Sequence, residues 1–219
     1  MNKKTIIITA ITLAVIILVG IITFVITGSK EKNSSNDKIV NINEKLAKNE
    51  YTITQKTDKV ETTIVRKDNN AYKEEKKENM TNKYYTKDGD TYELSEENKK
   101  LYKYADSNQM LYDFTSELED LENIKFTTGK EQINGKEYNY QEYGDYDSFL
   151  INLDLLENEI EEDEIEETKT RLYFSGKKLK YIKTIIGDKE ELIEVDISYK
   201  ANENILELPS DCEIVEVEY

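Results

Sequence analysis

"LIEVDISY", residues 192–199, alternates apolar and polar side chains from Ile193 to Tyr199. Ile193, Val195, Ile197 and Tyr199 fall on one side of an extended chain, and the side chains between them are acidic or carry a hydroxyl. This period of two is typical of a β-strand that buries one face and leaves the other in water. The stretch therefore predicts an antiparallel sheet with its apolar face toward the core.

Five turn signals divide the rest of the chain into short runs. Two are Asp or Asn followed by Gly and accept the positive φ of a type I′ turn, while one begins with Gly and suits a type II′ turn. The other two predict slightly longer loops. The signals are residues 66–70, Asp88-Gly89, Asn134-Gly135, residues 175–178 and Gly187-Asp188. Together they predict an extended meander of hairpins.

Two further runs alternate as half-buried strands do. In residues 60–65, Val60, Thr62 and Ile64 share one face. The alternation in residues 179–184 places Leu179, Tyr181 and Lys183 on one face, and Lys180, Ile182 and Thr184 on the other.

Tyrosine supplies much of the apolar surface, with 16 residues in the chain. Its ring fits a pleated sheet, completes a lean core and leaves its hydroxyl in water. A tyrosine-lined cavity or a carbohydrate-binding face is the alternative interpretation. Eleven tyrosines fall in predicted strands: Tyr72, Tyr84, Tyr85, Tyr92, Tyr102, Tyr104, Tyr138, Tyr140, Tyr143, Tyr173 and Tyr181.

Two segments carry apolar residues at spacings of three and four, which predicts helices. Each stripe is narrow, as expected for a helix lying on a sheet. The first stripe is Ile39, Ile42 and Leu46; the second is Met110 or Leu111, then Phe114, Leu118 and Leu121, with Asp106 or Ser107 as N-cap.

The N-terminal segment runs from Thr5 to Thr27 without a charged side chain. As a helix it would span roughly 34 Å, against a bilayer core of about 30 Å. No small-x-small cleavage site ends the run and no cysteine lies near it, which favours an uncleaved anchor over a signal peptide or a lipoprotein. We predict a cytoplasmic tail (residues 1–4), a transmembrane signal-anchor (5–27), a flexible tether (28–37) and an extracytoplasmic domain (38–219).

Basic residues flank both ends of this segment, so charge alone decides its orientation by a small margin. The short tail and the long acidic domain favour export of the C-terminal part. All 46 acidic and 28 of the 30 basic residues follow the anchor, which gives the exported part a net charge of 28 − 46 = −18.

The composition excludes several kinds of chemistry. A formal net charge of −16 opposes binding to a nucleic acid, and the absence of histidine removes the commonest general base. Cys212 is the one cysteine, so the chain has no internal disulfide, and no nucleophile or phosphate-binding motif is present. We predict no catalytic residue, no cofactor and no enzymatic activity.

An acidic run at residues 157–167 carries eight Asp and Glu side chains. It has no glycine and does not match the spacing of a calcium-binding EF-hand. Residues 87–93, "KDGDTYE", contain an Asp-Gly-Asp that a hairpin explains. We predict no metal site, and a solvated loop between two strands for the acidic run, where cations screen it or a partner meets it.

The order of these elements, and the ending "LIEVDISYKANENILELPSDCEIVEVE", resembles the half-barrel superfamily of periplasmic lipoprotein carriers and mycobacterial lipid-binding lipoproteins. The closest likeness is the strand from Ile193 to Tyr199, followed by Ile205, Leu208 and Pro209. The resemblance implies an α+β fold: a transmembrane helix, then one curved antiparallel sheet with two or more helices on its concave face, around an apolar cavity. The anchor departs from a soluble carrier and favours a fixed receptor, sensor or handover station.

These observations predict a membrane-anchored extracytoplasmic binding protein of the bacterial cell envelope for a lipid or other apolar ligand. The alternative is an envelope protein-interaction or sensing module without a small-molecule site. The expected partners are the membrane, an apolar ligand and an envelope protein. The cavity-lining candidates are Ile42, Leu46, Phe114, Leu118, Ile193, Val195, Ile197 and Tyr199.

Overall fold

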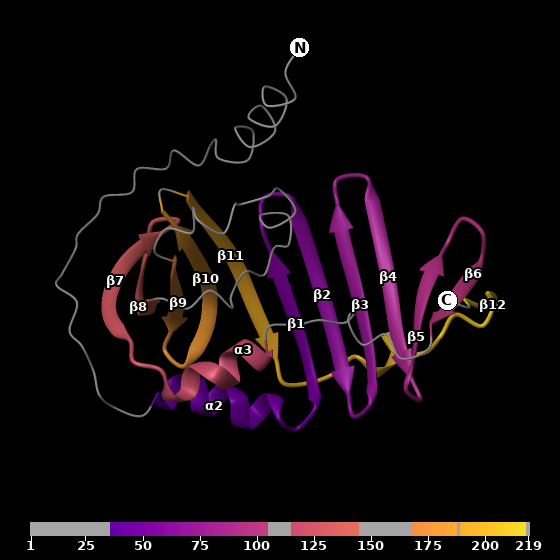
Figure 1. Cartoon of the computed structure of the whole chain (residues 1–219), viewed down its shortest axis with the longest axis horizontal. Coiled ribbons are helices and arrows are strands. Elements are labelled where there is room, and N and C mark those ends of the chain that lie inside the picture. Colours follow the sequence, from indigo (N-terminus) through magenta and orange to yellow (C-terminus); the bar gives the residue numbers. More distant parts are fainter. Residues whose placement is uncertain (1–35, 105–114, 145–167, 188, 218–219) are drawn as a thin grey trace, which may run out of the picture.

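The structure, a computed structural model, describes residues 36–104, 115–144, 168–187 and 189–217. They form one open sheet of 12 strands, largely antiparallel, with two short helices (Figure 1). The fold is therefore mostly β rather than the predicted α+β, because the described helical stretches are short. The predicted anchor and most of the tether, like the acidic run at residues 157–167, lie outside the described residues.

The sheet consists of two meanders that meet in its middle. The first is β1 (Glu50–Lys56), β2 (Val60–Lys67), β3 (Asn70–Lys77), β4 (Met80–Lys87), β5 (Asp90–Ser95) and β6 (Lys100–Tyr104). The second is β7 (Thr127–Ile133), β8 (Lys136–Gly144), β9 (Thr168–Ser175), β10 (Lys178–Ile186) and β11 (Lys189–Ser198). The strand order is β12-β6-β5-β4-β3-β2-β1-β11-β10-β9-β8-β7, and β12 (Glu213–Glu216) runs parallel to β6.

The predicted hairpins are present. Asp88 and Gly89 have φ of +55° and +91°, as a type I′ turn requires, and Asn134-Gly135 turns in the same way. The turns after β2 and β9 are shorter than predicted, since Lys67 pairs with Asn70 and Ser175 with Lys178. The hairpin between β3 and β4, where Glu78 has φ of +50°, had no sequence signal.

Strand β10 corrects one predicted face. Its pairing with β9 shifts register between Leu179 and Tyr181, which marks a β-bulge. An extra residue reverses the alternation. Leu179 therefore packs in the same core as Ile182, whereas Tyr181 joins a separate cluster that lies with Lys183 on the opposite face. The prediction that Leu179 shares a face with Tyr181 and Lys183 is wrong.

The structure contains the first predicted helix and describes the C-terminal part of the second. The first is α2 (Asp37–Leu46), and its stripe is buried as predicted. The second is described only from α3 (Thr115–Asp120), which continues as the 3₁₀ turn η2 (Leu121–Asn123). Its residues Met110, Leu111 and Phe114 lie outside the described residues. Figure 1 shows α2 and α3 together below the part of the sheet where β7 to β11 curve.

The main core lies between these helices and one face of the central strands. Its side chains come from α2, α3, η2, the segment before β7, and strands β1 and β8–β11. The buried members are Ile39, Ile42, Leu46, Tyr51, Ile53, Leu118, Leu121, Phe126, Tyr143, Leu172, Phe174, Leu179, Ile182, Ile193 and Val195. Strand β11 thus buries the apolar face that its alternation predicts.

A substitution at Gly129 in β7 tests the packing on the face of the sheet opposite the main core. Gly129 pairs directly with Tyr140, and a Cβ at this position would overlap the Tyr140 ring. We expect Gly129→Ala to lower the free energy of unfolding by about 1–3 kcal/mol, as overpacking does. Urea denaturation of the full chain, followed by tyrosine fluorescence, measures the change.

Gly144→Ala in β8 is the matched control, because a Cβ there has no atom within 4 Å. It should change stability by less than about 1 kcal/mol. Equal effects of the two substitutions would mean that the ring of Tyr140 does not occupy the space over Gly129.

Candidate functional site

The residues predicted to line a cavity converge on one layer between the helices and the sheet. Ile42, Leu46 and Leu118 approach from α2 and α3, and Ile193 and Val195 meet them from β11; all five are buried. At the edge of this layer the described chain adds two partly buried residues, Ile197 and Tyr199. Phe114 lies outside the described residues.

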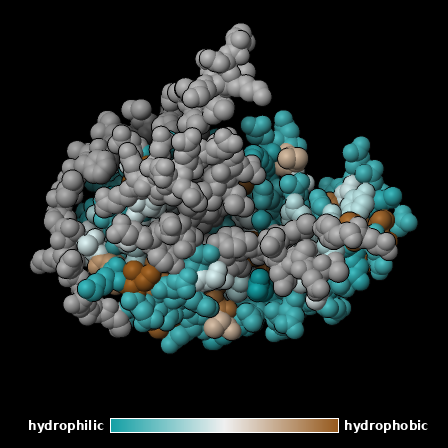
Figure 2. Space-filling model, in the orientation of Figure 1, coloured by the Kyte–Doolittle hydropathy of each residue, from teal (hydrophilic) through white to brown (hydrophobic). Residues whose placement is uncertain are grey.

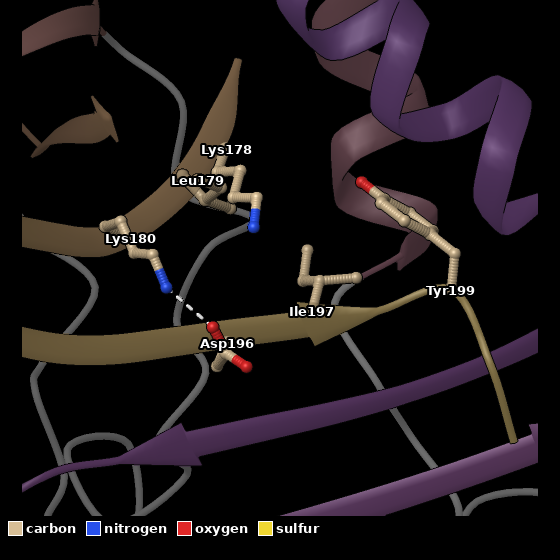
Figure 3. A pocket seen from close by; sticks show the side chains of 6 residues that line it. All are labelled: Lys178, Leu179, Lys180, Asp196, Ile197 and Tyr199. Carbon is tan, nitrogen blue, oxygen red and sulfur yellow. Dashed lines mark hydrogen bonds and ion pairs between the residues drawn. The ribbon is translucent and has the colours of Figure 1, made fainter. Parts of the chain in front are cut away.

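The described side chains of this layer pack into one cluster. A hollow at its edge, between the ends of β10 and β11, has a volume of about 10 Å³. That is room for about one water molecule, whereas pockets for drug-sized ligands measure about 300–1,000 Å³. Figure 3 shows Lys180 and Asp196 pointing toward each other beside it, 2.6 Å apart. The hollow is lined by Lys178, Leu179, Lys180, Asp196, Ile197 and Tyr199.

Buried amides fix α2 to its surroundings. Asn36, just before the helix, donates through Nδ2 to the hydroxyl of Tyr143 and accepts at Oδ1 from Gln141 Nε2 at 3.0 Å. Two helical turns further along α2, Asn43 Nδ2 donates to the Leu118 carbonyl at 3.0 Å. Burial raises the pKa of Tyr143, so its hydroxyl stays neutral. These bonds set the position of α2 more specifically than its apolar stripe does.

The opposite face of β7–β10 carries a buried ionic network. The Glu131 carboxylate accepts hydrogen bonds from Lys183 Nζ at 2.6 Å, from the Tyr173 hydroxyl at 2.6 Å and from Arg171 at 3.0 Å. The side chains of Glu131 and Lys183 are only 5% and 7% exposed. Arg171 also pairs with Glu142 and lies 4.7 Å from the centre of the Tyr140 ring.

The network holds its groups in their ordinary charge states. Burial by itself raises the pKa of Glu131, but hydrogen bonds from Lys183 and Tyr173 and the charge of Arg171 outweigh it and keep the pKa below its usual value. Burial and the Glu131 carboxylate raise the pKa of Tyr173, so its hydroxyl remains a donor. Since each group is engaged with its neighbours, the network links β7, β8, β9 and β10 to one another.

Sequence reasoning missed this network. Its one visible signal is Lys183, which the alternation of β10 places on the same face as Tyr181. Glu131 gave no signal, because it is one of 46 acidic residues and only the pairing of β7, β8, β9 and β10 brings it to Lys183.

The other candidates for chemistry have structural roles. In the segment 87–93, Asp90 pairs with Lys103 at 2.9 Å beside its hairpin. The described residues contain no group of three or more Asp, Glu, Cys or His side chains arranged to hold a metal ion. Burial and the neighbouring Asp211 raise the pKa of the Cys212 thiol, which keeps it protonated and weakly nucleophilic.

Comparisons with known proteins give this chain no family. No family model matches it, and the search of curated proteins found no relative. The likeness to the half-barrel superfamily therefore remains a prediction from the order of elements. In the described part of the chain, no helix has the length and apolarity needed to cross a bilayer.

The ionic network predicts a pH-dependent stability. Glu131→Gln removes the charge that Lys183 and Arg171 share, and we expect a loss of roughly 3 kcal/mol at pH 7. Because the folded pKa of Glu131 is lowered, its contribution is complete above the unfolded value of about 4.5 and disappears as the pH falls through the folded pKa. The difference between the two proteins, measured by denaturation across pH 3–7, should therefore shrink below about pH 4.5.

Glu137→Gln is the control on the same hairpin. Its ion pair with Lys130, at 2.8 Å, is exposed on both sides and should contribute less than about 1 kcal/mol. A pH-independent difference for Glu131→Gln would show that the carboxylate charge does not stabilise the folded state.

Proposed function

We propose that the chain is a membrane-anchored, extracytoplasmic module of the bacterial cell envelope that binds another protein through its open sheet. The observation that carries this proposal is the division of the sheet into two parts. The helices close the core over β1 and β8–β11, and the hollow beside it admits about one water molecule. Strands β2–β6 and β12 continue the sheet well beyond the helices (Figure 1).

The extended part has the size and surface of a recognition platform. Its hairpin ends carry exposed side chains, among them Met80, which is 57% exposed and joins the turn between β3 and β4. The described surface visible in Figure 2 is mostly hydrophilic, with small hydrophobic spots. Such a surface suits a partner that binds and dissociates in water, since transient interfaces are about as polar as the rest of a protein surface.

The proposed anchor and location rest on the sequence. The uncharged run from Thr5 to Thr27 is long enough to span a bilayer, and the described domain begins only nine residues after it, at Asn36. A tether of this length would keep the sheet close to the membrane. A fixed module of this kind acts as a receptor, sensor or handover station and not as a shuttle.

Binding of an apolar ligand, as in a half-barrel lipid carrier, is the second candidate. It is favoured by the convergence of seven predicted cavity residues on one layer and by the curvature of β7–β11 around it (Figure 1). In this mode α3 would move away from the sheet, because the hollow bounded by Leu179, Ile197 and Tyr199 is too small for an acyl chain.

Crosslinking in cells tests the interaction function. A photoreactive residue at Met80, the first residue of β4, or at Asn98, in the turn between β5 and β6, should capture the same protein in cells that express the full chain. The same residue at Glu137, in the other half of the sheet, is the control and should not capture it. Failure to recover a reproducible protein from Met80 and Asn98 would contradict the proposal.

Native mass spectrometry tests the second candidate. If the layer holds an apolar ligand, the full chain released from detergent should carry a bound acyl lipid, and Leu118→Asp should remove it. An equivalent change at the exposed Asn204 should leave the lipid in place. A wild-type protein free of lipid under conditions that preserve its fold would exclude this function.

A further inference from the structure

The C-terminal strap, residues 199–217, follows β11 and belongs to neither of the two hairpin meanders. It leaves β11 in the middle of the sheet, crosses the strands of the first meander and ends as β12 beside β6, at the far edge (Figure 1). Near its start, Thr52 Oγ1 in β1 donates to the Lys200 carbonyl at 3.0 Å. The strap thus connects the central strands with the sheet edge.

The strap packs on a row of mostly aromatic side chains that crosses the first meander. Tyr72, Tyr85 and Tyr92 are cross-strand neighbours in β3, β4 and β5, and Tyr72 and Tyr85 make an edge-to-face contact at 5.1 Å. The tyrosine row is Val65, Tyr72, Tyr85, Tyr92 and Leu101, one residue from each of β2–β6. From the strap, Leu206 is buried against this row; its partly buried neighbours are Ala201, Ile205, Leu208 and Cys212.

Three ion pairs hold the strap over the row at regular intervals. The acidic residues are four positions apart in the sequence: Glu203 pairs with Lys67, Glu207 with Lys87 at 2.7 Å, and Asp211 with Lys99 at 3.0 Å. The lysines come from the end of β2, the end of β4 and the turn just before β6. The first two lysines are two strands apart, about 10 Å. The strap makes the 3₁₀ turn η5 (Glu203–Ile205) between them.

The end of the strap adds a strand to the sheet. β12 pairs in parallel with β6, with Ile214 opposite Leu101, and this is the one parallel pair among the described strands. Glu213 N donates to the Lys99 carbonyl at 2.9 Å and Val217 N to the Lys103 carbonyl at 3.0 Å. The last residues of the strap, Glu213–Glu216, are therefore bound in the way an extended peptide binds a sheet edge, by β-augmentation beside an apolar row.

The contacts of the strap are weak compared with those of the main core. The carboxylates of its three ion pairs are 66%, 74% and 67% exposed, so each pair contributes little. β12 has four residues, and Ile214 within it is 52% exposed. No residue after Tyr199 belongs to the described main core, so the strap can leave without opening the layer under α2 and α3.

We propose that the tyrosine row and the β6 edge form a peptide-binding site, which the chain's own C-terminal strap fills until a segment of the partner protein replaces it. The inference rests on the proposed interaction function and names the kind of partner. The partner segment carries acidic residues four positions apart, for Lys67, Lys87 and Lys99, and makes a short turn at the first of them, as the strap does at Glu203–Ile205. Leucine-like residues lie between them, over the tyrosine row, and its last residues run parallel to β6.

A labelled peptide with the sequence of residues 201–217, carrying Cys212→Ser, is the probe. The host is the full chain in detergent with Leu206→Asp, which removes the buried contact of the strap and not that of the probe. We expect this host to bind the peptide at least tenfold more tightly than wild type does, by fluorescence anisotropy. The matched control host is Asn204→Asp, which adds the same charge at an exposed position and should bind like wild type.

A charge exchange tests the register. Lys87→Glu in the Leu206→Asp host should weaken peptide binding several-fold, and Glu207→Lys in the peptide should restore it. If the Leu206→Asp host binds the peptide no better than wild type, or if the exchange restores nothing, the inference is wrong. A wild-type dimer that Leu206→Asp converts to monomer would also overturn it, because a second copy would then be the occupant. Crosslinking from Met80 and Asn98 tests the proposed function separately.

Discussion

The pairing of β1 with β11 holds the two meanders together. Ile53 lies opposite Ile197 and Gln55 opposite Val195, so residues from the two ends of the described chain meet in the middle of the sheet. Closing so long a loop costs conformational entropy that local hairpins do not pay. Burial of Ile53 and Val195 under the helices offsets that cost, because both contribute apolar surface to the main core. Without this ladder the molecule would be two separate meanders.

The two faces of the curved half are stabilised by different chemistry. One face is apolar and is covered by α2 and α3, whose positions are fixed by Asn36 and Asn43. The other face buries Glu131 and Lys183 together under tyrosine rings. A buried ion pair of this kind adds little net stability compared with apolar residues, but it strongly penalises any arrangement that separates the charges. It therefore fixes the register of β7–β10.

The first meander depends less on a core of its own. Its buried residues form a single row across β2–β6, and the strap supplies the side chains that cover it. A sheet region with an apolar row, an edge strand and a weakly held covering segment has the features of a site for extended peptides. We propose that the half beneath the helices supports the domain and that the half beneath the strap binds the partner.

The sequence by itself determined the local structure. Asp88-Gly89 and Asn134-Gly135 specify tight turns because their own backbones accept positive φ, and the alternation in residues 192–199 identified the buried face of β11. This alternation and the helical spacing of Ile42, Leu46 and Leu118 together identified seven of the residues that meet in one layer. It could not show how these residues pack, because the cluster also takes side chains from β1, β8–β10, η2 and the segment before β7.

Only the tertiary structure decided which strands are neighbours and where the charges lie. The bulge between Leu179 and Tyr181 reverses the face of Leu179, and nothing in the local sequence requires it. Glu131 and Lys183 meet because three strand pairings bring them together, and the strap reaches β6 only because β1 and β11 are joined. Local patterns fix φ, ψ and the faces of a strand, whereas pairing depends on the free energy of contacts between distant segments, which no single segment contains.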